Sequence, residues 1–221
     1  LWSKADQVFL QRNGCPIGTL YGYKEEGIDP ATGEIIYADL DGSGSITEAD
    51  RTIIGNTNPD FTYSLTSRLS WKGLSLNFML QGSHGNDIFN YNLTDITMSN
   101  IGNITKTAYE GRWTPQTATT ATWPKPTAGY TRTWFVSDRY VEDGSYLRCK
   151  NVSLSYNWRN PVKFINALTF TASATNLFTI TGYDWYDPDV SAFGSDSSRH
   201  GLDLSSYPSA RSFNFSIQVS L

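Results

Sequence analysis

The chain has 221 residues, of which 17% are charged and 14% are aromatic, and its formal net charge is −4. A typical soluble domain is about 25% charged, so charge is scarce here, and Ser, Thr, Asn and Gly take its place. These values exclude a basic surface for nucleic acid and a disordered chain, and no run approaches the ~20 apolar residues of a membrane-spanning helix.

The first chemically informative feature in chain order is an acidic segment of twelve residues at 39–50. Read as an EF-hand-type loop, it has oxygen-bearing residues at the ligand positions and Gly44 where the loop must reverse. A hard cation such as Ca²⁺ binds six to eight oxygens at this spacing. The sequence therefore predicts a Ca²⁺ site, with Mg²⁺ as the less favoured ion. The predicted ligands are Asp39, Asp41, Ser43, the carbonyl of Ser45, Thr47 and Asp50.

Two residues of this segment depart from the EF-hand pattern. Ser43 stands where an acid or Asn is usual, and Asp50 is shorter than the bidentate Glu that normally closes the loop. No flanking helices are evident. The alternative is a Gly-, Ser- and Asp-rich surface turn that binds no ion. A bound ion would stiffen the loop rather than take part in catalysis.

Alternation with a period of two is the clearest pattern downstream, and it predicts β-strands. In residues 61–71, one face carries aromatic and aliphatic side chains, and the other carries Thr, Ser and Arg68. A turn at Lys72-Gly73 leads into the same alternation at 74–81, which predicts a hairpin of long strands. Further strands are expected at 151–158, 168–175 and 212–221. No segment shows the pattern of an amphipathic helix.

The polar face of these strands distinguishes between kinds of β-protein. A solvated face usually carries Lys, Glu, Asp and Arg, whereas this face is nearly all Ser, Thr, Asn and Gln. Small uncharged groups facing a lumen and apolar groups facing lipid are typical of a transmembrane β-barrel, whose strands have about 9–11 residues. Sheets of adhesins show a similar pattern, so alternation alone leaves both classes open.

Connection lengths favour the barrel. The turns at 72–73 and near 159–166 are short, whereas the links at about 82–145 and 181–207 are long. Outer-membrane barrels alternate in this way, with short periplasmic turns and long extracellular loops. Two regions are therefore expected. Residues 1–59 form an extracellular hairpin and loop region that contains the acidic loop, and residues 60–221 form C-terminal barrel strands with the two long loops.

The number of strands is too small for a closed barrel. Five strands, or six if one lies near residues 8–21, fall short of the eight or more that closure needs. Unpaired strand edges are not tolerated in lipid. The expected fold class is therefore all-β, with antiparallel strands of an outer-membrane β-barrel that is incomplete in this chain. The first residues lack a signal-peptide pattern, which fits a chain that continues upstream. Cys15 and Cys149 are expected to be unrelated thiols, with a Cys15–Cys149 disulfide as the alternative that the sequence leaves open.

Aromatic residues in the long connections are the candidate ligand-binding residues. They are Trp123, Trp134, Trp185 and Tyr186. One interpretation is a platform for sugar rings, and the other is loop packing or an aromatic belt at the membrane interface.

Arg148 and Lys150 lie four and two residues before Val152, so the alternation places them on the same face of the strand as Val152. That face is the one expected to meet lipid. A basic side chain on that face needs an explanation. One is a position at the headgroup rim, where a long side chain can snorkel. The other is a β-bulge that resets the alternation.

Taken in order, these motifs resemble the C-terminal part of the SusC/RagA-type TonB-dependent outer-membrane transporters. The resemblance is closest in DGSYLRCKNV at 143–152 and ATNLFT at 174–179. It also rests on 14–18, 21–23, 27–28, 37–39 with the acidic loop, 54–56, 58–61, 81–88, 112–114, Tyr183, 187–188 and 207–208. It covers nearly the whole chain, and the ordered set is specific although each motif alone is weak.

The resemblance implies a nutrient importer of the Gram-negative outer membrane. Such a protein has a plug inside a 22-stranded barrel, a SusD-like surface lipoprotein as a lid, and energy passed from the TonB complex to a part outside these residues. Its substrates are oligosaccharides or peptides, and nucleic acid is not among its partners. The long loops would be extracellular.

The residues leave one rival of another class, a secreted β-sandwich that binds carbohydrate and is stabilised by calcium. An enzyme is not expected, and no residue is assigned a catalytic role. His84 and His200 are isolated in the sequence, and nothing fixes the spacing of the carboxylates around Asp187.

Overall fold

The computed structural model describes residues 6–94, 103–126, 136–192, 194, 196 and 198–221. Their contacts divide the chain into two compact units. The first, here named the loop unit, consists of Leu1–Asn58, Asp87–Asp143 and Asp189–Ser206. The second, the sheet unit, consists of Pro59–Asn86, Gly144–Pro188 and Tyr207–Leu221. Each unit is thus assembled from three separate stretches of sequence.

The loop unit is built from short strands. β1 (Thr19–Gly22) pairs with β4 (Thr52–Asn56), and β2 (Glu25–Ile28) pairs with β3 (Ile35–Tyr37), both antiparallel. β7 (Asp87–Asn90) lies between the antiparallel β8 (Val141–Asp143) and the parallel β12 (Leu202–Asp203). Among the described residues, its helical elements include α3 (Lys106–Gly111), helical residues at 92–94, and the 3₁₀ turns η1 (Asp6–Val8), η2 (Glu48–Asp50) and η3 (Asp138–Tyr140).

One buried hydrophobic cluster holds the loop unit together. Its members come from all three stretches: Val8 and Leu20 from the first, Phe89 and Tyr140 from the second, and Leu202 from the third, together with Tyr91 and Val136. Strands of two to five residues are marginal alone. Burial of these side chains therefore supplies the stability that the short ladders lack.

One expectation for this unit is wrong. No barrel strand spans residues 8–21, because residues 6–8 form η1 and β1 begins only at Thr19 and pairs with β4 within the loop unit. A helix is also present. α3 has six residues, fewer than two turns, so it is too short to show a helical period in the sequence. Its N-terminus is capped by Thr105, whose hydroxyl oxygen accepts from the amide of Ala108 at 3.2 Å.

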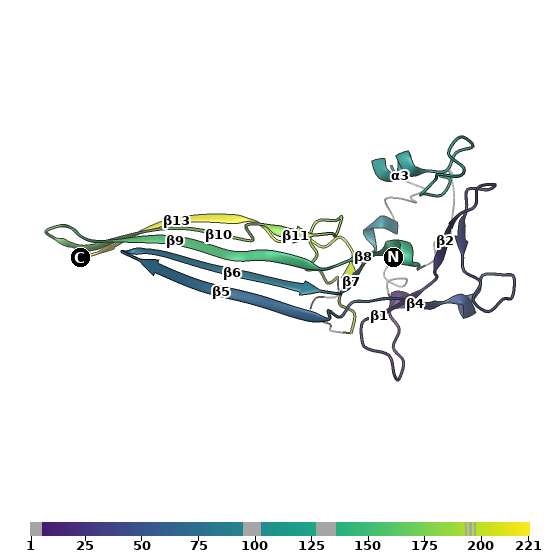
Figure 1. The fold of residues 1–221 in the computed structure, drawn as a ribbon, viewed down its shortest axis with the longest axis horizontal. Helices are drawn as coiled ribbons and strands as arrows, with labels where there is room; N and C mark the ends of the chain where they lie inside the picture. The colour runs from purple at the N-terminus through teal and green to yellow at the C-terminus, as the bar shows by residue number, and fades with distance from the viewer. Residues whose placement is uncertain (1–5, 95–102, 127–135, 193, 195, 197) are drawn as a thin grey trace. The chain divides into compact units, whose positions relative to one another are not determined.

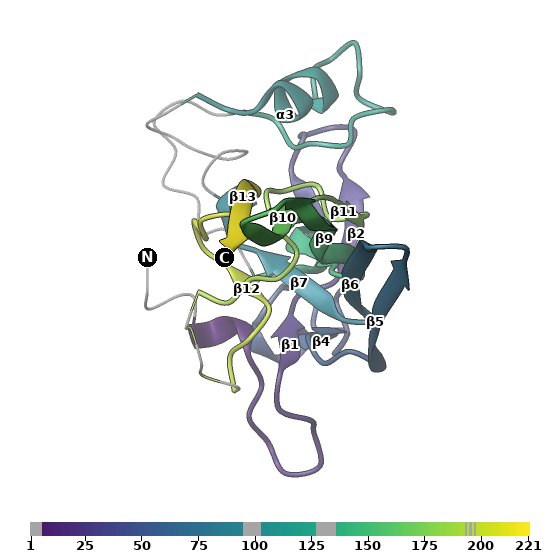
Figure 2. The same cartoon turned by 90° about the vertical axis from the view of Figure 1, so that its left-hand side faces the viewer.

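The sheet unit contains the long strands. They are β5 (Phe61–Trp71), β6 (Leu74–His84), β9 (Tyr146–Val162), β10 (Ile165–Thr175) and β13 (Ser212–Ser220). They form one antiparallel sheet in the order β13-β10-β9-β6-β5, and the short β11 (Thr179–Thr181) also pairs with β9 (Figure 1). Figure 2 shows the same strands closer to end-on, following one another in this order. The five predicted strands are confirmed, although β9 is longer at both ends than the alternation indicated.

The tight hairpin between β5 and β6 follows from its two turn residues. Lys72 and Gly73 both have positive φ, 45° and 88°. Two consecutive left-handed residues make the turn whose twist matches that of the flanking strands. Glycine adopts this conformation without steric cost, while Lys72 is held in it by the pairing of Trp71 with Leu74.

Register across the sheet keeps the two kinds of side chain apart. One row of cross-strand partners runs Ser70, Ser75, Ser155, Thr171 and Ser216. The next row, on the other face, runs Trp71, Leu74, Tyr156, Phe170 and Ile217. Because side chains alternate across a strand, every strand presents its polar residues to one face of the sheet and its apolar residues to the other.

A β-bulge explains why Arg148 seemed to lie on the apolar face. Between β6 and β9 the register shifts at Met79/Leu80, so that Met79 pairs with Asn151 but Leu80 pairs with Cys149. Lys150 is left without a partner on β6, and beyond it the parity of β9 is inverted. Arg148 therefore pairs with Gln81 on the polar face. The bulge interpretation is confirmed, and snorkelling is not needed because Arg148 is buried.

The apolar face is exposed. On the outer strands, Tyr63 is 40% accessible and Phe215 is 82% accessible. A β-sandwich would bury such a face against a second sheet, so the sandwich alternative is wrong for this sheet. Within the described residues, β5 and β13 each have a neighbouring strand on one side only. No helix in the described part of the chain is both long and apolar enough to span a membrane.

Candidate functional site

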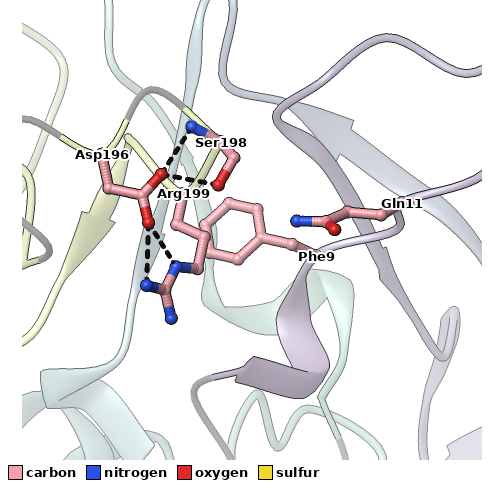
Figure 3. Close-up of a pocket in the computed structure, with 5 residues that line it drawn as sticks. All are labelled: Phe9, Gln11, Asp196, Ser198 and Arg199. Carbon is pink, nitrogen blue, oxygen red and sulfur yellow. Dashed lines mark hydrogen bonds and ion pairs between the residues drawn. The ribbon is translucent and has the colours of Figure 1, made fainter.

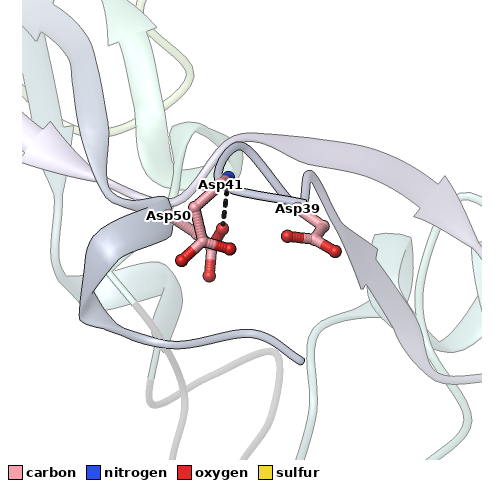
Figure 4. A group of neighbouring side chains, drawn as sticks. All are labelled: Asp39, Asp41 and Asp50. Atoms are coloured by element: carbon pink, nitrogen blue, oxygen red, sulfur yellow. Dashed lines mark hydrogen bonds between the residues drawn. The ribbon is translucent and has the colours of Figure 1, made fainter. Parts of the chain in front are cut away.

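The acidic loop brings three of its predicted ligands together. One carboxylate oxygen from each of Asp39, Asp41 and Asp50 lies within 4.8 Å of the others. Figure 4 shows the three side chains. The loop is closed from inside by amides: Gly44 N–H donates to Asp39 at 2.7 Å, and Ser43 N–H donates to Asp41 at 2.9 Å. The hydroxyl of Ser43 lies 3.0 Å from the Ser45 carbonyl oxygen.

Asp50 and Thr47 also have a purely structural role. Asp50 is fully buried, and its carboxylate accepts from the amides of Leu40 and Thr47, at 2.8 and 2.7 Å. Thr47 and Asp50 form a capping box on η2. The hydrogen bond from the Thr47 amide, with those from Asp41 and Leu40, lowers the pKa of Asp50 although burial raises it. The carboxylate is therefore held ionised, as a cation ligand must be.

These residues fit a hard divalent cation. An ionised carboxylate has about four lone-pair sites, and the amide donors use only some of them. Three carboxylates this close repel one another unless a positive charge lies between them. The Ca²⁺ site as a whole, including the contributions of Ser43, Ser45 and Thr47, stays a prediction.

The predicted aromatic residues lie in different surroundings. In the loop unit, Trp123 is half-buried, with the guanidinium of Arg139 4.7 Å from its ring centre. In the sheet unit, Trp185 and Tyr186 form an edge-on pair with ring centres 5.0 Å apart, and Tyr186 is 70% accessible. Trp134 lies outside the described residues. Of the three described residues, Tyr186 therefore has the most exposed side chain, and the role of all four stays a prediction.

A polar pocket in the loop unit was not anticipated. It has a volume of about 510 Å³ and is lined by Phe9, Gln11, Asp196, Ser198 and Arg199 (Figure 3). Asp196 accepts from the amide and hydroxyl of Ser198, and it forms an ion pair with Arg199 at 2.8 Å. The hydrogen bonds from Ser198 and Arg199 lower the pKa of Asp196 to about 2. The charges of this pocket are thus satisfied internally.

The sheet unit contains a buried ion pair that the sequence analysis missed. Arg148 and Asp187 are bonded to each other, and their side chains are only 2% and 6% accessible. Arg148 also donates from Nε to the hydroxyl of Thr179 at 3.0 Å and from Nη1 to that of Ser209 at 3.4 Å. The second oxygen of Asp187 accepts from the amide of Ser209 at 2.9 Å. One side chain of β9 thereby joins β11 and the segments that carry Asp187 and Ser209.

The signal that could have led to this pair is the parity of Arg148. A basic residue on an apolar face points to a bulge, and a bulge turns the side chain to the polar face, where it needs an anion. The partner could not be identified in this way, because 39 residues separate Arg148 from Asp187.

Comparison with curated proteins gives relatives along nearly the whole chain. The TonB-dependent receptor P3 of Formosa agariphila is 34% identical over 237 residues, covering 96% of this chain and 23% of that protein. The TonB-dependent receptor SusC of Bacteroides thetaiotaomicron is 25% identical over 186 residues, covering 81% of this chain and 17% of that protein. The chain thus spans less than a quarter of either relative. No protein-family model matches it.

Comparison with solved structures gives the same fold. The RagAB peptide transporter matches with a TM-score of 0.73 and 23% identity, over 91% of this chain and 22% of that one. The RagAB peptide importer in its closed-closed state matches with a TM-score of 0.72 over 96% of this chain and 25% of that one. At this identity the likeness concerns the fold: the all-β class and the barrel-type sheet are confirmed.

The buried ion pair predicts a strongly coupled double-mutant cycle. Asp187→Leu leaves the buried Arg148 without its counter-charge, and Arg148→Met leaves the buried Asp187 without its own. Each single change should cost about 3–5 kcal/mol of unfolding free energy. The double variant should be markedly more stable than the sum of the single changes predicts. Denaturant unfolding of the intact protein measures this, with the exposed Arg159→Met as the control. Additive losses would contradict a direct charge pair.

Proposed function

We propose that this chain, a homologue of the SusC/RagA-type TonB-dependent receptors along nearly its whole length, forms part of the barrel wall of an outer-membrane nutrient importer. The single observation that carries the proposal is the two-faced sheet. Its apolar rows are exposed, and its polar rows are built from Ser, Thr and Asn. A surface of this kind is stable where one side meets lipid and the other meets water.

The mechanism follows from the two faces. A lumen lined by small uncharged groups lets a polar substrate pass without binding it tightly, while the apolar face holds the wall in the bilayer. The unpaired sides of β5 and β13 require further strands of the same protein. A plug in the lumen, outside this chain, would gate the passage and receive energy from the TonB complex.

The loop unit belongs, in this proposal, to the extracellular side. The long connections of the sheet enter it, and extracellular loops of such barrels are the long ones. A SusD-like surface lipoprotein would close over this side and deliver oligosaccharides or peptides. The chain itself performs no chemistry in this scheme. Asp187, the one carboxylate buried in the sheet unit, is engaged by Arg148.

The orientation of the sheet is tested by placing the same charge on its two faces. Phe215→Arg puts a cation on the lipid face, which costs about 2–4 kcal/mol near the bilayer midplane, whereas Asn214→Arg puts it on the polar face at the adjacent position. Folded receptor in the outer membrane, measured by heat-modifiable mobility of the intact protein, should fall strongly for the first variant and little for the second. Equal yields would contradict the assignment of the faces.

The transport activity is tested in cells. Deletion of the gene for the intact receptor should abolish uptake of its labelled substrate from a panel of oligosaccharides and peptides, and complementation should restore it. Loss of TonB should have the same effect because the transport is energised. A deletion strain that takes up the whole panel at the wild-type rate would contradict the importer function. Co-purification with a surface lipoprotein tests the partner separately.

The acidic loop supports a second proposal, that it binds Ca²⁺ as a structural ion. Asp39, Asp41 and Asp50 would supply carboxylate oxygens, and the Ser45 carbonyl lies in the same loop. The bound ion would neutralise the three converging charges. It would thereby fix residues 39–50 between β3 and β4 of the loop unit.

Calcium binding predicts a metal-dependent melting temperature. After chelator treatment, added Ca²⁺ should stabilise the intact receptor, by about 2.7 kcal/mol at a concentration 100-fold above Kd, and Mg²⁺ should do less. Asp39→Ala should remove the response. Asp29→Ala, which alters another turn carboxylate of the loop unit, should keep it. An identical response to Ca²⁺ in the wild type and Asp39→Ala would exclude this site.

A further inference from the structure

A second pocket lies beside the buried ion pair, within the sheet unit. Its volume is about 340 Å³, and its lining includes Arg148, Asn176, Thr179, Asp187, Ser209 and Arg211, together with Tyr186. Arg148 and Thr179 are cross-strand partners on the polar face of the sheet. The pocket therefore opens on the face that, by the function proposed above, meets the substrate. Its size is within the range of small-ligand sites.

The charge of the pocket favours an anion. Arg148 and Asp187 neutralise each other, so the positive charge of Arg211 gives the lining a net charge of +1. Arg211 is exposed, and within the described residues it has no hydrogen bond or ion pair. A guanidinium presents its donors in a planar fork that matches a carboxylate. A lining with a net charge of +1 and a free fork is suited to a carboxylate ligand.

Two hydroxyl groups add donors beside this cation. The oxygens of Thr179 and Ser209 both accept from Arg148, at 3.0 and 3.4 Å. A hydroxyl that accepts in this way still has its own hydrogen to donate. Arg148 therefore does more than balance Asp187: it orients two hydroxyls of the pocket as donors. Both residues are exposed and can be reached by a ligand.

Asn176 carries local strain at the wall of the same pocket. Its φ is +49°, in the left-handed region, and its amide nitrogen donates to the carbonyl of Ala210 at 3.0 Å. Its side-chain oxygen is buried without a hydrogen-bond partner. Left-handed residues other than glycine and unsatisfied buried polar atoms cluster at functional sites. Both features occur here in one residue.

Tyr186 identifies the kind of molecule that carries the carboxylate. Its ring is 70% accessible and is held edge-on against Trp185. An open aromatic face beside amide and hydroxyl groups packs well on the C–H face of a sugar ring. We propose that this pocket binds a uronate unit of an acidic oligosaccharide. The carboxylate lies on Arg211 and the hydroxyls of Thr179 and Ser209, and the ring lies against Tyr186. The proposal rests on the importer function and specifies its substrate class.

The test uses two disaccharides that differ only at the group the pocket is proposed to recognise. Cellobiouronic acid has a carboxylate where cellobiose has a CH₂OH group. Calorimetric titration of the intact receptor in detergent should show the uronate binding at least 10-fold more tightly, with the difference shrinking at high salt. Arg211→Gln should reduce uronate affinity by at least 10-fold. Arg159→Gln, which removes an exposed Arg elsewhere on β9, should leave it unchanged.

Further variants keep the result interpretable. Asn176→Gly removes the amide while accepting the positive φ, and Tyr186→Ala removes the ring; each should weaken the uronate without changing the melting temperature greatly. Equal affinity for the two disaccharides, or an Arg211→Gln variant that binds the uronate as the wild type does, would overturn the proposal. Preference for a short acidic peptide over the uronate would also overturn it. With any of these three results, uptake of neutral substrates in cells would show that only the uronate site is wrong and that the proposed importer function is still supported.

Discussion

The structure depends on register. Five strands are locked side by side by backbone hydrogen bonds, and the side chains of each alternate between the faces with a period of two. A slip of one residue in any strand would therefore exchange all its polar and apolar side chains. The sheet keeps Ser155, Thr171 and Ser216 in one row and Tyr156, Phe170 and Ile217 in the next. Separation into an apolar face and a polar face follows from this one constraint.

At the bulge at Lys150 the register between β6 and β9 shifts by one residue. The pocket beside Arg148 depends on this shift. Without the extra residue, Arg148 would project from the apolar face, which the function proposed above places in lipid, where a cation is costly. With it, Arg148 turns to the polar face and meets Asp187, Thr179 and Ser209. A local irregularity of one strand thereby joins separate segments of the chain and organises a pocket. β-Bulges are known to re-aim side chains next to functional sites.

The loop unit shows how long connections can be ordered without long strands. Its ladders have at most five residues, so they cannot supply stability by themselves. Val8, Phe89 and Leu202, which are far apart in sequence, share one buried cluster. Polar contacts add to it: Glu25 and Arg139 form a largely buried ion pair, and Arg139 also lies over Trp123. Connections that look like loops in the sequence are therefore parts of one packed unit.

Features that depend on neighbouring residues were determined by the sequence alone. These are the five alternating strands, the Lys72-Gly73 turn and the convergence of Asp39, Asp41 and Asp50, because the pleat, a two-residue turn and a twelve-residue loop act over short separations. The tertiary structure decided the pairing of β1 with β4, the shared core of the loop unit and the partner of Arg148. Each of these closes a long loop. The number of residues between two segments sets the entropy lost when they are brought together. Which segments pair depends on the relative free energies of all possible long-range contacts, and these cannot be read from the spacing.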